Sequence, residues 1–319
     1  MMADHTADGF DPLGFSAIPT PPEGFRSGFV GIVGRPNVGK STLMNALVGQ
    51  KVAITSPTAQ TTRNRLRGIL STDQAQIIFV DTPGIHKPYH ELGKILVKNA
   101  RMAIDSVDAT LFVVDGSVAA GRGDEFVAAL LTQSQGPVIL GVNKIDQQPA
   151  DCAAIDTSYQ AMAAAHGWPL VKFSALQATQ LDALLQTLVT QLEPGPYYYP
   201  PDLVTDQPER FIMGELIREQ ILLHTREEVP HSVAIGIDRV EEDTTITRIL
   251  ATIHVERDSQ KGILIGKKGS MLKAIGSDAR QQIQKLVMGS VYLELFVKVV
   301  PKWRQSRSRL EDFGYRVES

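Results

Sequence analysis

A candidate phosphate-binding loop lies at residues 34–41, which read Gly-Arg-Pro-Asn-Val-Gly-Lys-Ser. This segment fits the pattern G-x-x-x-x-G-K-[ST], follows an apolar run at 29–33 and opens a helical pattern, the context that the motif requires. Glycines let backbone N–H groups turn toward phosphate oxygens, and a helix N-terminus adds positive potential. We expect Lys40 to bridge two phosphates and the Ser41 hydroxyl to hold Mg²⁺. The residues expected to bind the ligand here are Gly34, Asn37, Val38, Gly39, Lys40, Ser41 and Thr42.

A second candidate is the sequence Asp-Thr-Pro-Gly at 81–84, directly after an apolar run at 77–80. Open α/β sheets place ligand-binding residues at the carboxyl ends of their strands. We expect Asp81 to hold the same Mg²⁺ and the N–H of Gly84 to reach the terminal phosphate. Such a tetrapeptide alone is often an Asp-capped turn, and the loop upstream favours the phosphate-site interpretation.

The third candidate, Asn-Lys-Ile-Asp at 143–146, ends the apolar run 138–142. A carboxylate at Asp146 can accept hydrogen bonds from both the ring N–H and the exocyclic amine of guanine, whereas adenine has no matching ring N–H. An acceptor left without its donor costs on the order of 1–3 kcal/mol. The sequence therefore predicts guanine selection by Asp146, with Asn143 and Lys144 beside it. A capped turn is the alternative.

These motifs, in this order at strand ends, resemble those of the translation-factor-related GTPases. The resemblance implies that the backbone of Ser174, Ala175 and Leu176 contacts the guanine oxygen. It also implies that residues 58–63 form the first switch loop, with Thr62, or alternatively Thr61, on Mg²⁺ and the γ-phosphate. Without the family, both threonines would be ordinary loop hydroxyls.

Ile85 follows Gly84 at the position where Ras-like proteins carry the glutamine that orients the attacking water. The sequence thus resembles GTPases with a hydrophobic residue there, whose relatives are thought to place K⁺ by means of a loop asparagine, here Asn37. We expect slow hydrolysis that K⁺ accelerates, with Lys40, Thr62, Gly84 and Asn37 as the catalytic residues.

A basic segment near the C-terminus predicts a nucleic-acid interface. Between residues 257 and 309 there are 12 Lys and Arg residues against three acidic ones, a net charge of +9. Gly-Lys-Lys-Gly at 266–269 joins two helical patterns, and such a loop can clamp phosphates beside a groove for unstacked bases. A helix-to-helix turn without a ligand is the alternative, and Trp303 could equally close the core. The candidate RNA-binding residues are Gly266, Lys267, Lys268, Gly269, Lys273, Lys302, Trp303, Arg304 and Arg307.

Two kinds of domain must position these residues. From residue 29 onward, short apolar runs alternate with helical patterns, which predicts an α/β fold with a mostly parallel sheet. The runs at 66–70 and 77–80 are close enough to pair antiparallel. After a proline-rich stretch, the order α-β-β-α-α-β resembles that of the type II KH domain, an α+β RNA-binding fold. We predict a disordered leader (1–27), a P-loop GTPase domain (28–193), a linker (194–206) and a KH domain with a C-terminal basic helix (207–319).

The composition of the 319 residues, 43% hydrophobic and 21% charged, is that of a soluble globular protein, and the length favours two domains. No uncharged run is long and apolar enough to span a bilayer. The single cysteine and the acidic N-terminal residues predict a reducing, cytoplasmic compartment.

A GTPase domain followed by a KH domain resembles the bacterial ribosome-assembly GTPases. The resemblance implies GTP/GDP and Mg²⁺ as ligands, and the 3′ end of small-subunit ribosomal RNA and the 30S subunit as partners of a monomer. It also implies peripheral inner-membrane association, for which the residues give no independent support. The alternatives are a nucleotide-independent RNA chaperone, the double-GTPase ribosome factor and the tRNA-modifying GTPase. A single nucleotide domain and the lack of a C-terminal cysteine speak against the last two.

Overall fold

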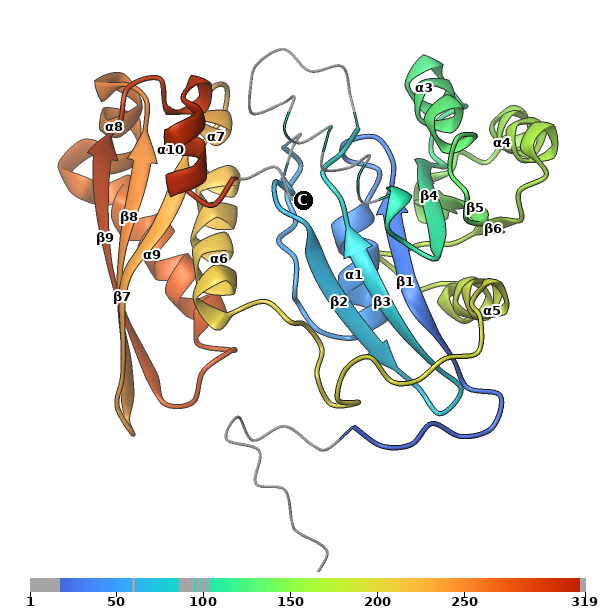
Figure 1. Ribbon diagram of the computed structural model, residues 1–319. Coiled ribbons are helices and arrows are strands. Elements are labelled where there is room, and N and C mark those ends of the chain that lie inside the picture. The colour runs from blue at the N-terminus through green and yellow to red at the C-terminus, as the bar shows by residue number, and fades with distance from the viewer. Residues whose placement is uncertain are drawn as a thin grey trace, which may run out of the picture.

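The computed structural model describes residues 18–58, 61–85, 95, 98, 102 and 104–315, and these form two sheets, each covered by helices (Figure 1). The first sheet has six strands in the order β2-β3-β1-β4-β5-β6. Its strands are β1 (Arg26–Val33), β2 (Leu66–Ser71), β3 (Ala75–Asp81), β4 (Ala109–Asp115), β5 (Val138–Asn143) and β6 (Leu170–Lys172). All neighbours pair in parallel except β2 and β3, which are antiparallel. The predicted mixed sheet is confirmed.

Helices cover both faces of this sheet, as buried parallel strands require. They are α1 (Lys40–Val48), α3 (Arg122–Leu131), α4 (Ala153–His166) and α5 (Leu181–Gln191). The apolar sides of α1 and α5 pack on one face, and those of α3 and α4 pack on the other. Because the parallel strands run in one direction, their carboxyl ends meet at one edge of the sheet. The residues after β1, β3 and β5 are thereby brought to the same edge.

The second sheet has the order β7-β8-β9, with β8 antiparallel to β7 and parallel to β9. Its strands are β7 (Ala234–Glu242), β8 (Ile246–Val255) and β9 (Ser290–Val299), and the helices are α6 (Glu209–His224), α7 (Val229–Ser232), α8 (Asp258–Ile265), α9 (Ser270–Ile283) and α10 (Arg307–Asp312). The core lies between the sheet and α6 and α9. The predicted order α-β-β-α-α-β is present, with the short helix α7 added and the short helix α10 after it. None of the helices in the described ranges is long and apolar enough to cross a bilayer.

The predicted leader is shorter than expected at its C-terminal end. Strand β1 begins at Arg26, and Phe25 is buried with its ring 4.3 Å from that of Tyr197, centroid to centroid. The prediction of disorder up to residue 27 is therefore wrong for residues 25–27, because one aromatic residue gives no periodic signal in the sequence. Residues 1–17 lie outside the described part of the chain.

The segment predicted as a linker follows the β2–β3 side of the first sheet. The side-chain amide of Gln76 accepts hydrogen bonds from the backbone N–H of Tyr198 (2.7 Å) and Tyr199 (3.0 Å) and donates one to the Tyr199 carbonyl (2.9 Å). Farther along, Ile69 N–H donates to the Val204 carbonyl (2.8 Å). The chain that leads to α6 is thus fixed to the sheet.

Candidate functional site

The loop at residues 34–41 joins β1 to α1 at the carboxyl edge of the first sheet. Gly39 precedes the helix with φ +96°, and a Cβ atom there would lie 2.4 Å from Nδ2 of Asn143. Only glycine suits this position, because the backbone is left-handed and the space is already filled. The same Asn143 amide donates to the Val38 carbonyl (2.8 Å), so β5 supports the loop from behind.

Lys40 points into the loop. Its ammonium donates to the carbonyls of Arg35 (2.9 Å) and Gly34 (3.3 Å), and its side chain is buried. Burial lowers the pKa of Lys40 to about 8, although the nearby charge of Asp81 opposes this shift. A buried cation surrounded by loop carbonyls can bind an anion strongly, because the surrounding dielectric is low.

Three oxygen atoms converge beside Lys40. Ser41 Oγ lies 2.6 Å from Asp81 Oδ2 and 2.8 Å from Thr62 Oγ1, and Thr62 Oγ1 lies 3.0 Å from the same Asp81 oxygen. The second Asp81 oxygen, Oδ1, is buried without a hydrogen-bond partner, and burial raises the pKa of Asp81 while Lys40 opposes the shift. Two hydroxyls and a carboxylate are the hard oxygen donors that Mg²⁺ prefers. The residues therefore fit this ion.

Of the two threonines considered in the switch loop, only Thr62 reaches this cluster. Thr61 instead makes hydrogen bonds through its hydroxyl to Ser56 Oγ (2.8 Å) and the Thr58 carbonyl (2.6 Å). Asn37 has a positive φ of 64° and donates from Nδ2 to the Pro57 carbonyl (2.9 Å), so it joins the phosphate loop to the start of the same switch segment.

Gly84 and Ile85 pack directly against the phosphate loop. A Cβ atom on Gly84 would lie 2.7 Å from the backbone nitrogen of Pro36, which excludes any larger residue without a shift. The backbone N–H of Ile85 donates to the Gly34 carbonyl (3.1 Å). The Ile85 side chain is buried in the core between the first sheet and helices α3 and α4. Ile85 is thus turned inward, where an apolar side chain is stabilised.

The proposed base-binding residues lie together at the ends of β5 and β6. Asp146 accepts from Ser174 Oγ (2.5 Å), and Asn143 Oδ1 accepts from the backbone N–H of Ala175 (2.9 Å). Lys144 pairs with Asp115 Oδ2 (2.6 Å) at the end of β4. Leu176 remains 68% exposed in the loop that follows. The sequence motifs at 143–146 and 174–176 form one cluster.

A pocket of about 830 Å³ connects these parts. On the first domain it is lined by the phosphate loop and the switch segment, including Asn37, Gly39, Lys40, Ser41, Thr42, Thr62 and Gly84. From the base cluster Lys144 and Leu176 line it, whereas Asn143 and Asp146 are not among its lining residues. The volume is in the range of small-molecule sites.

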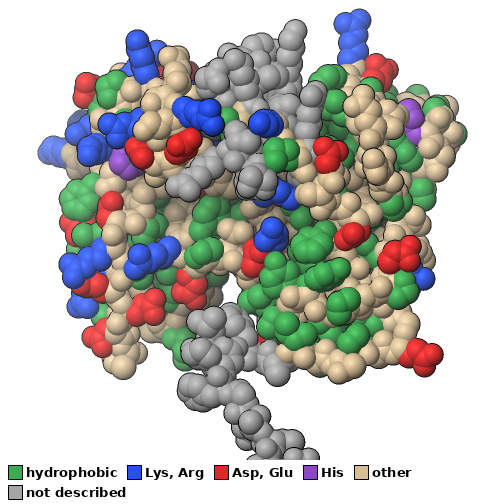
Figure 2. Space-filling model, in the orientation of Figure 1, with side chains coloured by type: hydrophobic (Ala, Val, Ile, Leu, Met, Phe, Trp, Pro, Cys, Tyr) green, Lys and Arg blue, Asp and Glu red, His purple; other side chains and the backbone are tan. Residues whose placement is uncertain are grey.

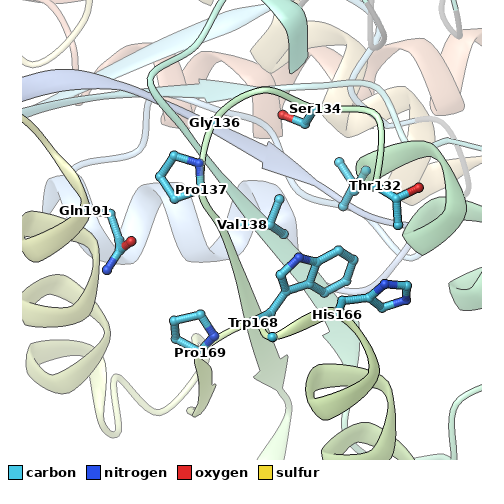
Figure 3. Close-up of a pocket in the computed structure, with 11 residues that line it drawn as sticks. Thr132, Ser134, Gly136, Pro137, Val138, His166, Trp168, Pro169 and Gln191 are labelled. Atoms are coloured by element: carbon cyan, nitrogen blue, oxygen red, sulfur yellow. The ribbon is translucent and has the colours of Figure 1, made fainter.

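A second pocket of about 440 Å³ lies at the opposite edge of the sheet, by the amino ends of β5 and β6 (Figure 3). His166 and Trp168 stack there with ring centroids 4.3 Å apart, and Gln191 of α5 is on the far side. None of the residues singled out from the sequence lines this pocket.

The Gly-Lys-Lys-Gly loop lies between α8 and α9 as a single tight turn, with positive φ at Gly266 (69°), Lys268 (52°) and Gly269 (79°). Both lysine side chains are exposed. The loop borders a groove of about 440 Å³ between α9 and β9, lined in part by Lys273, Arg280 and Leu295. Lys and Arg side chains are more numerous over the half of the molecule that contains β7–β9 (left in Figure 2) than over the other half. This groove and its charge suit a single-stranded nucleic acid.

The predicted RNA contact of Trp303 is wrong for this structure. Its side chain is 0% exposed, its Nε1–H donates to the Ser232 carbonyl (3.0 Å), and its ring stacks on Tyr315. The guanidinium of Arg304 is partly occupied within the protein, because it forms an ion pair with Glu256 (Nε to Oε2 3.0 Å). Arg307 is largely exposed and Lys302 is exposed in a left-handed turn, so these two cations remain accessible. The predicted basic helix is a short turn followed by α10.

Several residues between the two domains were missed by the sequence analysis. Glu219 of α6 accepts from Lys51 Nζ (2.5 Å) and from the backbone N–H of Thr55 (2.9 Å), both in the first domain. Arg63 donates to the carbonyls of Val233 (2.6 Å) and Pro230 (3.0 Å) in the second domain. The charged residues of the helix 209–224 gave no signal of these contacts, because charges on a helix ordinarily face solvent.

The phosphate loop at the carboxyl edge of the first sheet, with the base cluster beside it, defines the first domain as a P-loop GTPase. The Gly-Lys-Lys-Gly loop between two helices of an α-β-β-α-α-β fold defines the second as a KH domain. Comparison with known families agrees: residues 29–144 match the family described as 50S ribosome-binding GTPase, and residues 228–304 match the KH domain. The chain belongs to the GTPase Era family, since its relatives include the GTPase Era proteins of Nostoc sp. (74% identical, covering 95% of this chain and 93% of that protein) and Rippkaea orientalis (69%, 96% and 98%).

Two solved structures are similar over both domains. One is Era in complex with MgGDPNP and nucleotides 1506–1542 of 16S ribosomal RNA, at 39% identity and a TM-score of 0.87, covering 91% of this chain and 99% of that one. The other is an Aquifex aeolicus Era variant bound to GDP and AlF₄⁻, at 40% identity and a TM-score of 0.86, with the same coverage.

Proposed function

We propose that this protein is a GTP-hydrolysing switch that binds the 3′ end of small-subunit ribosomal RNA and acts in assembly of the 30S subunit. The observation that carries the proposal is the presence, in one chain, of the Ser41–Thr62–Asp81 oxygen cluster beside Lys40 and an exposed Gly-Lys-Lys-Gly loop beside a basic groove. The Era structure with an Mg²⁺–guanine nucleotide and 16S RNA supports the assignment of both ligands.

In this proposal the phosphate loop holds the nucleotide through its backbone N–H groups and Lys40, and Asp146 reads the base. Ser41, Thr62 and Asp81 hold Mg²⁺, which neutralises charge on the phosphates when it is bound. Thr62 and Gly84 respond to the γ-phosphate, so that hydrolysis releases their loops.

We further propose that Asn37 helps to place K⁺ at the hydrolysis site, because Ile85 is buried and cannot orient water. The expected outcome is a higher rate of phosphate release in potassium buffer than in sodium buffer at equal ionic strength. Equal rates would remove K⁺ from the proposal.

On the RNA side, the backbone and lysines of residues 266–269 clamp phosphates, and Lys273 lines the adjoining groove. Lys302 and Arg307 extend the cationic surface beyond the groove. We propose that the protein acts as a monomer in the cytoplasm. From the family resemblance we also propose peripheral contact with the inner membrane.

The test is fluorescence anisotropy of a labelled oligonucleotide with the 3′-end sequence of the small-subunit RNA against a scrambled one. The protein is saturated with a GTP analogue or with GDP. We expect tighter binding of the authentic sequence in the GTP-analogue form. Binding that ignores the nucleotide would favour a constitutive RNA chaperone, and binding that ignores both nucleotide and sequence would remove ribosomal RNA as the partner.

A further inference from the structure

The KH domain forms part of the wall of the pocket that contains the phosphate loop. Besides the GTPase residues, that pocket is lined by Gln220 and Leu223 of α6 and Gln282 of α9. A guanine nucleotide that reaches from the phosphate loop to the base cluster occupies this same pocket. Residues of the RNA-binding domain therefore lie within reach of the ligand of the other domain.

Buried charges hold α6 against this pocket. Glu219, 2% exposed, accepts hydrogen bonds from Lys51 and Thr55, and Arg218, 1% exposed, donates to the Thr61 carbonyl across the interface. Both side chains make these contacts with the first domain only while the helix is docked, so the contacts fix the position of α6 beside the switch segment. The neighbouring Gln220 is thus held in place at the pocket.

The three KH side chains have the apolar and polar groups with which a binding pocket contacts a nucleotide. Leu223 is 52% exposed although it is a large apolar residue, and Leu176 of the base cluster, 68% exposed, lines the same pocket. A ligand that covers such side chains removes apolar surface from water. The amide of Gln282 can both donate and accept, which suits the hydroxyls of a ribose. Gln220 is 5% exposed and its Nε2 donates to Glu219 Oε2 (3.4 Å), which leaves its Oε1 as an acceptor.

We propose that Gln220, Leu223 and Gln282 contact the bound guanine nucleotide, so that the docked KH domain slows nucleotide release. This inference rests on the proposed binding of guanine nucleotide at this site. A consequence is that anything that draws α6 away from the GTPase domain, including RNA, accelerates nucleotide exchange.

The test measures release of tritiated GDP from the full-length protein after addition of excess unlabelled GDP. An unmodified ribose is used because a fluorophore attached there would disturb the contacts in question. The variants are Leu223→Ala and Gln282→Ala. Their matched controls are Leu286→Ala and Gln281→Ala, exposed residues of the same domain that do not line the pocket.

We expect each pocket variant to release GDP about fivefold faster, the factor that corresponds to the loss of one modest contact. The controls should release it at the wild-type rate. The melting temperature without nucleotide should stay unchanged, whereas its increase on addition of GDP should shrink only in the pocket variants. Wild-type release rates in Leu223→Ala and Gln282→Ala would overturn the inference, and failure of the wild-type protein to retain GDP would instead overturn the proposed nucleotide site.

Discussion

At the scale of single residues, the proposed selection of guanine rests on one carboxylate, that of Asp146. It lies beside Ser174, whose hydroxyl donates to it, in the cluster that Asn143 connects to the phosphate loop. In the proposed role, its oxygens accept from the ring N–H and the exocyclic amine of guanine.

Replacing Asp146 by Asn should change base preference from guanine toward xanthine, because one acceptor becomes a donor. We expect the affinity for GTP to fall about 10- to 100-fold, as the loss of a charged hydrogen bond implies, while the affinity for XTP rises. Competition binding measures both. Asp151→Asn, an exposed change nearby, is the control and should keep GTP selectivity. Retained selectivity in Asp146→Asn would mean that another residue reads the base.

We expect His254 of β8 to make the stability of the fold depend on pH. Burial and then Lys298 lower the pKa of His254 below its usual value of 6.5, with Asp238 opposing, and its Nδ1 is buried without a partner. The unfolded chain therefore binds the proton more readily, so stability is lost as the pH falls below about 6.5. We expect the melting temperature to drop between pH 7.5 and 5.5 more steeply in the wild type than in His254→Asn. Parallel pH profiles would contradict this.

At the scale of elements, the periodicity of apolar residues predicted where strands and helices form. It did not predict which residues, far apart in the sequence, pack against one another. Apolar runs predicted β3 and β5 because strands buried on both faces contain little else. Trp303 closes the core, the alternative to an RNA contact that the sequence left open, since it stacks on Tyr315 and donates to the carbonyl of Ser232, 71 positions away. Its basic neighbours in sequence do not indicate this environment. Local sequence reports propensity, and burial depends on contacts that form only in the folded chain.

The Gly-Lys-Lys-Gly loop is an element whose role can be tested alone. Lys267→Asp with Lys268→Asp should reduce RNA affinity at least about tenfold and lower its salt dependence, because two phosphate contacts become repulsive. GTP affinity should not change. The control is Lys285→Asp, a charge reversal at an exposed lysine beyond the end of α9. RNA affinity unaffected by the double reversal would make the loop a plain turn between helices.

At the scale of the whole molecule, the switch segment is bound to both domains. Thr62 belongs to the oxygen cluster of the nucleotide site, and the next residue, Arg63, is buried in the KH domain under the ring of Tyr315. No local pattern in the sequence indicates this, since Arg63 and Tyr315 are 252 positions apart. A movement of the loop at Thr62 must be transmitted to the KH domain or break the contacts of Arg63.

Arg63→Ala should therefore lower the stability of the fold and weaken the dependence of RNA affinity on the bound nucleotide. The carbonyls of Val233 and Pro230 lose their donor, which we expect to reduce the free energy of unfolding by about 2–3 kcal/mol. The ratio of RNA affinities in the GTP-analogue and GDP forms should also approach one. Chemical denaturation and RNA titration measure the two effects. Arg65→Ala, which removes an exposed hydrogen bond to Ser106, is the control.

The attachment of residues 194–206 to the first sheet also limits where the chain can bend when the KH domain rotates. Gln76 fixes residues 198–199, Ile69 fixes Val204, and Arg67 pairs with Asp206 (2.6 Å), so the chain is fastened up to that point. Helix α6 begins at Glu209. Phe211 in the first turn of α6 also packs against the core of the first domain. A rotation of the KH domain that keeps the contacts of residues 198–206 can bend the chain only after Asp206, and it must release Phe211 from that core.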